Sequence, residues 1–269
     1  MIKLVDLQAD WGFKNRLSRI IRPKSGHCVM FAVDHGYFGN IPGQLKCFTD
    51  LSPLFEHADA LMLTRGMLRN CVDAELDIPI VLRVSAGASM LKELSNEEIN
   101  VSIGDALRLN VSALTCSIFV GGEYEKQSLL NLSKIINWGQ EYGIPTLAVT
   151  AVGREMARDA RYLGMASRMA AEMGATFVKT YYCEEFEKVT TMCPAPIVIA
   201  GGKKIPEKDA LQMARNAIDK GAVGVDMGRN IFQSDSPIGM IKAVREIVHN
   251  GASVDDAYEV YENGPKGLC

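Results

Sequence analysis

This sequence has few aromatic residues, no excess of basic charge and no long apolar run. Phe, Trp and Tyr make up only 7% of the 269 residues. No uninterrupted apolar run approaches the ~20 residues of a membrane-spanning helix, so we expect no membrane partner. The first twenty residues carry acids and an amphipathic pattern in place of the apolar region of a signal peptide. These absences predict a cytoplasmic protein.

Metal and disulfide patterns are absent as well. The seven cysteines are an odd number and form no C-x-x-C pair, which indicates reduced thiols. The four histidines have no ligand spacing around them, so we predict no metal site. A net charge of −3 disfavours a broad nucleic-acid surface. It leaves room for a small basic site that binds a phosphorylated metabolite.

Short apolar runs are abundant. Hydrophobic residues make up 48% of the chain, enough for a sizeable core. Eight runs are nearly continuously apolar and end in Gly, Asp or polar residues, as strands do when both faces of a parallel sheet are buried. The runs are 28–36, 60–66, 78–87, 114–122, 144–153, 175–182, 195–204 and 222–232.

Helical periodicity fills the segments between these runs. The strands and helices alternate without a linker, which predicts a single α/β domain over residues 1–269, a (β/α)₈ TIM barrel with its core at about 28–250. A doubly wound sheet would usually show a G-x-G-x-x-G turn after its first strand, whereas this one ends in Asp-His-Gly. A helix over 11–21 is expected to cover the N-terminal face of the barrel. The other predicted helices are 97–110, 123–143, 154–174, 206–221, 237–249 and 253–262.

Lys179 stands inside an otherwise buried strand. Side chains alternate along a strand, so it shares a face with Phe177 and Tyr181. Burial among apolar groups, near other cations, disfavours the charged form of a lysine. The neutral amine can then attack a ketone and form a Schiff base. The alternatives are a surface lysine or a buried lysine paired with an acid.

Asp34 is the candidate acid/base group. It follows the first strand, at the C-terminal face where catalytic residues of such barrels lie. A carboxylate there could carry protons during imine formation. Alternatively, Asp34 caps a helix or forms a salt bridge with Arg65 or Arg83. His35 must face elsewhere if Asp34 faces the pocket, so we interpret it as structural.

Two glycine-containing loops predict a phosphate site. Barrels often bind phosphate with the loops that follow strands seven and eight. Gly201, Gly202 and Lys203 follow the seventh predicted strand, and Gly228 and Arg229 follow the eighth. Glycines let backbone N–H groups approach a phosphate, and the basic side chains add charge. Whether Lys203 or Lys204 faces the ligand stays open, as does the interpretation of both loops as ordinary turns.

These motifs together resemble those of the DeoC/FbaB-type class I aldolase family, and the likeness covers about residues 11–262. The resemblance implies a Schiff base on Lys179, acid/base chemistry at Asp34 and phosphate binding by the loops at Gly201-Gly202 and Gly228-Arg229. The motifs are 33-VDHG-36, 178-VKTYY-182, 200-AGGKK-204 and 226-DMGRNIFQ-233.

The resemblance also implies a reaction. A phosphorylated dione from autoinducer-2 breakdown is cleaved, and its acetyl group passes to coenzyme A, giving acetyl-CoA and dihydroxyacetone phosphate. Coenzyme A is then a co-substrate, no cofactor is tightly bound, and the protein is a homo-oligomer, by analogy a decamer.

One departure from the family separates the alternatives. Archaeal aldolases and ulosonate synthases of this group carry a proton-shuttling tyrosine at the end of strand five, where this chain reads 149-VTAVG-153. Its absence disfavours the second hypothesis, an aldolase acting on a sugar phosphate. Cys183 lacks an activating base nearby, so we interpret it as a bystander. The third hypothesis is a non-catalytic barrel that binds a phosphorylated metabolite.

Overall fold

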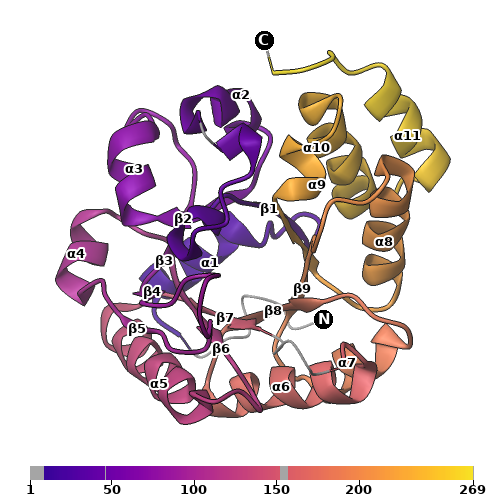
Figure 1. Cartoon of the computed structure of the whole chain (residues 1–269). Helices are drawn as coiled ribbons and strands as arrows, with labels where there is room; N and C mark the ends of the chain where they lie inside the picture. Colours follow the sequence, from indigo (N-terminus) through magenta and orange to yellow (C-terminus); the bar gives the residue numbers. More distant parts are fainter. Residues whose placement is uncertain (1–8, 46, 152–156, 269) are drawn as a thin grey trace.

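The computed structural model describes residues 9–45, 47–151 and 157–268 of the chain. Eight parallel strands close into a barrel with helices around it (Figure 1). The order around the barrel is β1-β10-β9-β8-β7-β6-β3-β2, and each of the eight predicted runs contains one of these strands, except that β6 begins one residue before its run. The predicted TIM barrel is therefore confirmed. The barrel strands are β1 (Cys28–Ala32), β2 (Ala60–Thr64), β3 (Ile80–Arg83), β6 (Ala113–Ile118), β7 (Thr146–Thr150), β8 (Phe177–Tyr181), β9 (Ile197–Ala200) and β10 (Gly224–Met227).

The barrel strands bury both faces. Because side chains alternate along each strand, one set points to the barrel interior and the other to the surrounding helices. Phe177 belongs to the interior cluster, whereas Val178 packs in the larger cluster under the helices. Lys179 therefore follows Phe177 into the interior, as the two-residue period predicts. The interior cluster includes Cys28, Met30, Ala32, Ala60, Met62, Val81, Ala113, Leu147, Phe177 and Val198.

The helices form the outer layer. Short helices follow β2 and β8, and long helices follow β6, β7 and β9. A π-helical turn, η5 (Glu246–Asn250), extends α10. Within the described residues, no helix is long and apolar enough to cross a membrane. The helices that follow the first strand are α2 (Ser52–Phe55), α3 (Arg65–Cys71), α4 (Ile103–Arg108), α5 (Glu125–Tyr142), α6 (Ala160–Met173), α7 (Phe186–Met192), α8 (Glu207–Asp219), α9 (Arg229–Phe232), α10 (Pro237–Arg245) and α11 (Val254–Glu262).

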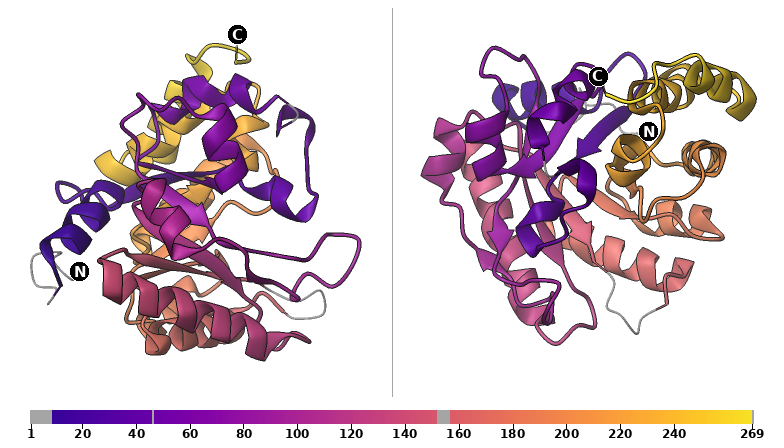
Figure 2. Two further views of the ribbon diagram at one scale, coloured as in Figure 1. Left: turned by 90° about the vertical axis from the view of Figure 1, so that its left-hand side faces the viewer. Right: turned by 45° about the horizontal axis from the view of Figure 1, so that its top comes forward.

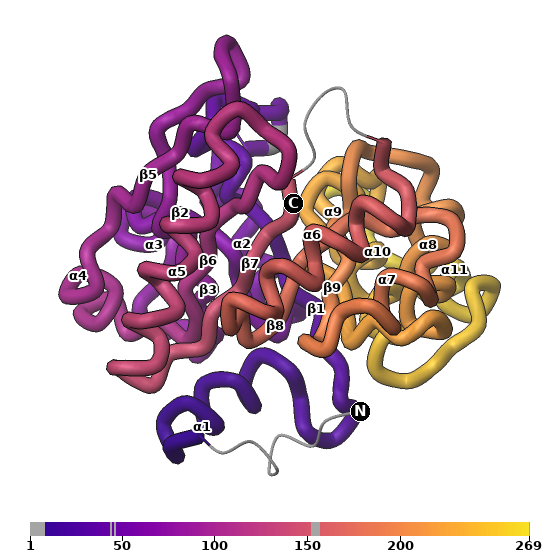
Figure 3. Tube along the Cα trace, turned by 90° about the horizontal axis from the view of Figure 1, so that it is seen from below, coloured from indigo at the N-terminus to yellow at the C-terminus, as the bar shows by residue number. Residues whose placement is uncertain are grey.

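The N-terminal helix α1 (Trp11–Ile20) lies across one end of the barrel (Figures 2 and 3). Leu17 and Ile20 are buried and belong to the same cluster as the interior residues of the strands. Burial of each such side chain stabilises the fold by about 1.5–3 kcal/mol. The predicted cover of the N-terminal face is confirmed.

One predicted helix is only partly present. Residues 97–110 begin with β5 (Glu98–Ile99), which pairs antiparallel with β4 (Ser85–Ala86), and α4 starts only at Ile103. The carboxylate of Glu97 holds this hairpin, since it accepts hydrogen bonds from Tyr37 (2.8 Å) and Ser85 (2.7 Å). Of predicted helix 154–174, residues 154–156 lie outside the described residues, and α6 begins at Ala160 after a cap by Asp159.

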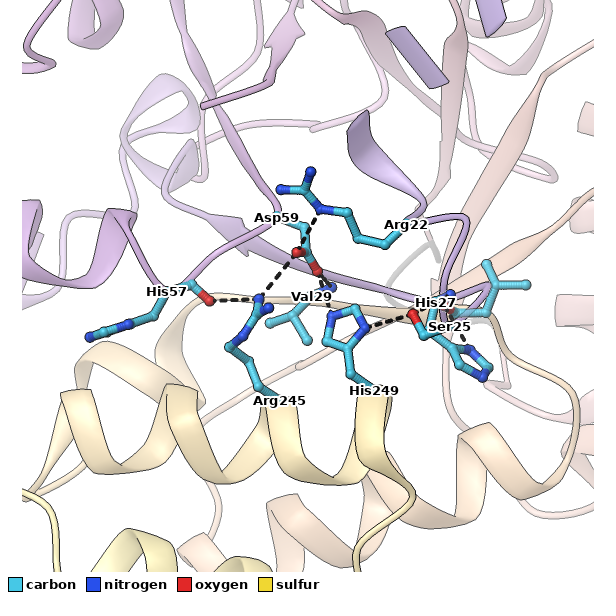
Figure 4. A network of polar contacts seen from close by, with 9 residues as sticks. Arg22, Ser25, His27, Val29, His57, Asp59, Arg245 and His249 are labelled. Atoms are coloured by element: carbon cyan, nitrogen blue, oxygen red, sulfur yellow. Dashed lines mark hydrogen bonds and ion pairs between the residues drawn. The ribbon is translucent and has the colours of Figure 1, made fainter. Parts of the chain in front are cut away.

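A buried carboxylate, Asp59, fastens the N-terminal end of the barrel (Figure 4). It accepts hydrogen bonds from Arg22 (3.0 Å), the backbone N–H of Val29 (2.7 Å) and Arg245 (3.1 Å), and its Oδ2 lies 2.7 Å from Nε2 of His249. Burial raises its pKa, but His249, the Val29 N–H and Arg245 lower the pKa to about 2. Asp59 therefore connects the segment that follows α1 with β1, α10 and η5.

Candidate active site

Lys179 lies in the barrel interior near the C-terminal end of β8. Its neighbours in register are Val149 on β7 and Val198 on β9, and only 8% of the residue is exposed. The ammonium group lies 3.7 Å from the sulfur of Met62 on β2. The amine is therefore largely shielded from water by the interior of the barrel. The predicted burial of Lys179 is confirmed.

The nearest charged partner of Lys179 is Asp226, which the sequence prediction did not include in the site. Oδ2 of Asp226 lies 2.7 Å from Nζ of Lys179, and the residue is 1% exposed. Among the described residues, neither oxygen of Asp226 receives a hydrogen bond, and the contact with Lys179 is an ion pair. Burial raises the pKa of Asp226 above its ordinary value, against the opposing charge of Lys179. A carboxyl group with these properties can exchange a proton with the adjacent amine.

Asp34 lies just beyond the end of β1 and is buried. It accepts a hydrogen bond from Nε of Arg83 at 3.0 Å, so the salt bridge that the sequence left open is made with Arg83. Arg83 also donates to Ser117 at 2.9 Å. Burial raises the pKa of Asp34, but the charges of Arg83 and Lys179 outweigh burial and hold the pKa below its ordinary value. Asp34 is therefore an anion within the electrostatic reach of Lys179.

The two predicted phosphate loops lie side by side. Asn230 joins them: its Nδ2 donates to the carbonyl of Gly201 (2.5 Å), and its Oδ1 accepts from the N–H of Ile205 (2.9 Å). Gly202 has φ +68°, a conformation that favours glycine, and it borders open space. Gly228 has a packing reason for its identity, because a Cβ there would lie 2.2 Å from the carbonyl oxygen of Ala32.

The basic side chains of these loops differ. Lys204 donates to the carbonyl of Ile205 and pairs with Glu207, both at 2.7 Å, whereas Lys203 is exposed. Lys204 is therefore held against the loop that precedes α8 and against Glu207, the first residue of that helix. Arg229 is half-buried, and its Nε atom is buried without a hydrogen-bond partner among the described residues. Burial lowers the pKa of Arg229.

Aromatic and cationic groups complete this side of the mouth. The guanidinium of Arg158 lies 4.0 Å from the ring centroid of Tyr181, which points inward with Lys179. His35 packs edge-on against Phe232, and burial lowers its pKa to about 4. His35 is therefore a neutral ring under the β10 loop, in line with its predicted structural role. Arg158 was missed because a loop arginine carries no periodic signal.

Other predictions concern Cys183 and the end of strand five. Cys183 is buried, and burial raises the pKa of its thiol, which disfavours the reactive thiolate. The described part of the strand-five segment ends at Ala151, and Val152 and Gly153 lie outside the described residues. Among the described residues, no group of three or more His, Cys, Asp or Glu side chains is arranged to hold a metal ion.

Sequence comparison assigns the family. Residues 28–234 match the model described as DeoC/LacD family aldolase. The chain belongs to the DeoC/LacD aldolase family. A 3-hydroxy-5-phosphonooxypentane-2,4-dione thiolase of Enterobacter sp. (strain 638) is 55% identical to it over 96% of this chain and 88% of the relative. A thiolase of the same name from Escherichia coli (strain K12) is 54% identical over 94% of this chain and 87% of the relative.

Solved structures confirm the fold of this DeoC/LacD family member. An archaeal fructose 1,6-bisphosphate aldolase superposes with a TM-score of 0.78 at 23% identity, covering 89% of this chain and 100% of that chain. A fructose-bisphosphate aldolase from Slackia heliotrinireducens DSM 20476 gives a TM-score of 0.84 at 17% identity, and the superposition covers 97% of this chain and 95% of that chain. At these identities, the likeness concerns the barrel and its N-terminal helix.

Proposed function

We propose that this chain is a thiolase that cleaves 3-hydroxy-5-phosphonooxypentane-2,4-dione and transfers its acetyl group to coenzyme A, through an imine on Lys179. The observation that carries the proposal is the buried amine of Lys179, 2.7 Å from the carboxyl group of Asp226 at the mouth of the barrel. The thiolases at 54–55% identity supply the substrate.

The positions of the carbonyl groups fix where the imine forms. The acetyl group consists of carbons 1 and 2, so the bond between carbons 2 and 3 must break. An imine at carbon 4 lies next to carbon 3 and can accept the electron pair of that bond. Lys179 therefore attacks the carbonyl at carbon 4, and one water leaves as the iminium forms.

Acetyl transfer then follows without net oxidation or reduction. The sulfur of coenzyme A bonds to carbon 2, and the thiol proton passes to a carboxylate of the site. The bond between carbons 2 and 3 breaks, the carbonyl at carbon 2 re-forms as the thioester, and the electron pair moves to the iminium nitrogen. The enamine takes the proton back at carbon 3. Water hydrolyses the resulting imine and releases dihydroxyacetone phosphate.

We assign the proton transfers to two carboxyl groups of different character. Asp226, whose pKa is raised by burial, exchanges protons with Nζ as the imine forms and breaks. Asp34, held anionic by Arg83, is the second acid/base group and accepts a hydrogen bond from the substrate hydroxyl. The sequence analysis named Asp34 as the acid/base candidate and left open whether a second group takes part, and we assign that second role to Asp226.

The substrate phosphate is assigned to the loops after β9 and β10. Gly201, Gly202 and Gly228 let the backbone approach it, and Lys203 and Arg229 neutralise it. The unpartnered Nε of Arg229 and the open space beside Gly202 support this assignment. By the family resemblance, we further propose a homo-oligomer, with a decamer as the expected state in light scattering.

A product assay separates this function from an aldolase. The protein is incubated with the phosphorylated dione, with and without coenzyme A, and acetyl-CoA and dihydroxyacetone phosphate are quantified. We expect both products in equal amounts, and only when coenzyme A is present. Cleavage of fructose 1,6-bisphosphate without coenzyme A, and no acetyl-CoA from the dione, would favour an aldolase instead. Dione binding without turnover of either compound would favour the non-catalytic barrel.

A further inference from the structure

A pocket of about 390 Å³ opens beside the Lys179 site, over β1, β2 and β3. Its volume lies within the usual range for small-molecule sites. The loops assigned to the substrate phosphate lie elsewhere, after β9 and β10. The pocket therefore offers a second direction of approach to the same reaction centre. Its lining includes Asp34, Arg83, Asn100 and Arg65, together with several apolar side chains.

The inner end of the pocket is shared with the reaction centre. Asp34 and Arg83 line the pocket and also form the buried ion pair of the site. Lys179 lowers the pKa of Asp34 by its charge, and Arg83 likewise acts on Asp226, so these groups lie within electrostatic reach of one another. A ligand seated in the pocket would contact the Asp34–Arg83 ion pair of the reaction centre.

The middle of the pocket is apolar. Leu45 and Phe48 are buried, while Ile41 and Met67 are 56% and 37% exposed. Exposed apolar side chains at the rim of a pocket are typical of a surface that a ligand covers. Asn100 supplies an amide that can hydrogen-bond to an amide group in such a ligand.

The outer end carries excess positive charge. Arg65 lines the pocket and belongs to a cluster in which three arginines share the carboxylate of Asp105. Arg65 lies 3.3 Å from this carboxylate and Arg108 lies 3.0 Å from it, and Arg69 is the third partner. Three positive charges against one negative charge leave a surplus of two within this cluster. Guanidinium groups that are half-exposed, as in Arg65 and Arg69, or largely exposed, as in Arg108, are suited to phosphate.

We propose that this pocket binds coenzyme A, with the pantetheine arm in the apolar section and the nucleotide phosphates at the Arg65–Arg69–Arg108 cluster. The ligand has a thiol at one end, amide groups along a flexible arm, and phosphates at the other end. The pocket offers matching groups, which are the buried Asp34–Arg83 pair, the apolar side chains with Asn100, and the more exposed Arg65. The assignment rests on the proposed function, because it identifies the binding site of the acetyl acceptor.

Two variants test the pocket by different means. Arg65→Gln removes one phosphate-binding charge and leaves Arg69 and Arg108 with Asp105. Met67→Glu places a negative charge at the rim, where an exposed side chain can change without disturbing the core. Arg168→Gln is the matched control, since Arg168 is a half-exposed arginine on α6 paired with Glu172.

The readouts are the KM for coenzyme A, the KM for the dione, and the yield of borohydride-reduced adduct without coenzyme A. We expect each pocket variant to raise the KM for coenzyme A by ~10-fold to 100-fold, as the loss of a charge-assisted contact implies. The KM for the dione and the adduct yield should stay at the wild-type level, as should all values for Arg168→Gln.

Two results would overturn the pocket assignment, and only one of them would also overturn the proposed thiolase function. If the wild-type protein makes acetyl-CoA but both folded pocket variants keep its KM for coenzyme A, then the acceptor binds elsewhere and the thiolase function stands. If the wild-type protein makes no acetyl-CoA, the proposed function and the pocket assignment fail together. Unchanged melting temperatures establish that the variants are folded.

Discussion

Asp59 and Asp226 are each 1% exposed, yet their surroundings differ in kind. Asp59, at the N-terminal end of the barrel, has three hydrogen-bond donors and a histidine around it, and its pKa is lowered to about 2. Asp226, toward the C-terminal end, has the amine of Lys179 on one oxygen and no hydrogen bond on the other within the described structure. Its pKa is raised.

The difference shows how one barrel separates stability from chemistry. A buried carboxylate that is fully hydrogen-bonded stays ionised and fastens the elements around it. A buried carboxylate with an unfilled oxygen is costly to keep charged, and it is ready to take a proton. The unfilled group lies at the end of the barrel where catalytic residues of this fold collect.

The largest effect is expected from Lys179→Ala. Without the amine no imine can form, so turnover of the dione should fall below detection while the fold is kept. Lys188→Ala is the matched control, because Lys188 is an exposed lysine on α7. The measurement is the initial rate of acetyl-CoA formation. Wild-type-like turnover by the Lys179 variant would exclude the Schiff-base mechanism.

Asp226→Asn tests the reactive member of the pair of carboxylates. Loss of a positioned proton carrier should lower kcat by ~10²-fold to 10⁴-fold. Stability at pH 7 should change little, because two effects oppose each other: the raised pKa means that the charged carboxylate is unfavourable in the fold, whereas its removal leaves the buried Lys179 without its acid partner. Steady-state kinetics and urea unfolding give the two numbers. A stable variant with unchanged kcat would remove Asp226 from the mechanism.

Asp59→Ala tests the structural member. It leaves Arg22, Arg245 and His249 without their common partner, so the free energy of unfolding should fall by about 2–4 kcal/mol. Because Arg22 and Arg245 are partly exposed, their charges can reach water, which limits the loss. Activity per folded molecule should be retained. Urea unfolding at pH 7 measures the change, and a loss as small as that of a surface substitution would contradict the role given to Asp59.

The smallest expected effect concerns the pH dependence of stability. The pKa of His35 is about 4 in the fold, against an ordinary value of 6.5, because the ring is buried. Between these two values the unfolded chain binds a proton that the folded chain does not, so stability falls as the pH drops from 6.5 toward 4. For Asp59, the corresponding loss of stability occurs at lower pH, as the pH falls from 3.8 to about 2.

His35→Gln should therefore reduce the stability difference between pH 7 and pH 4.5, as measured by urea midpoints. Burial also lowers the pKa of His27 and of His57, so these residues contribute in the same direction. His57→Gln serves as the control and should change the difference less. An equal change in both variants would mean that His35 is not specially desolvated.

The sequence predicts the barrel because its strands are buried on both faces, which leaves nearly continuous apolar runs such as 28–36 and 195–204. Lys179 stands out for the same reason, as a charged residue within a buried run. The β4–β5 hairpin was missed, since two-residue strands carry no periodicity. The helix predicted over 97–110 was wrong in its first part for that reason.

The partnership of Lys179 and Asp226 could not be predicted from the sequence. The two residues lie on β8 and β10, separated by β9, and they meet only because the closed barrel points both side chains to its interior. The choice of Arg83 over Arg65 as the partner of Asp34 depends on the same geometry: Arg83 points into the barrel, while Arg65 begins α3 and pairs with Asp105.

Trapping of the imine tests the central claim most directly. The protein is incubated with the phosphorylated dione, reduced with borohydride, and analysed by intact mass and peptide mapping, with Lys179→Ala in parallel. We expect one reduced adduct per chain, located on Lys179 and absent from the variant. A folded protein that turns over the dione without an adduct on Lys179 would contradict the account.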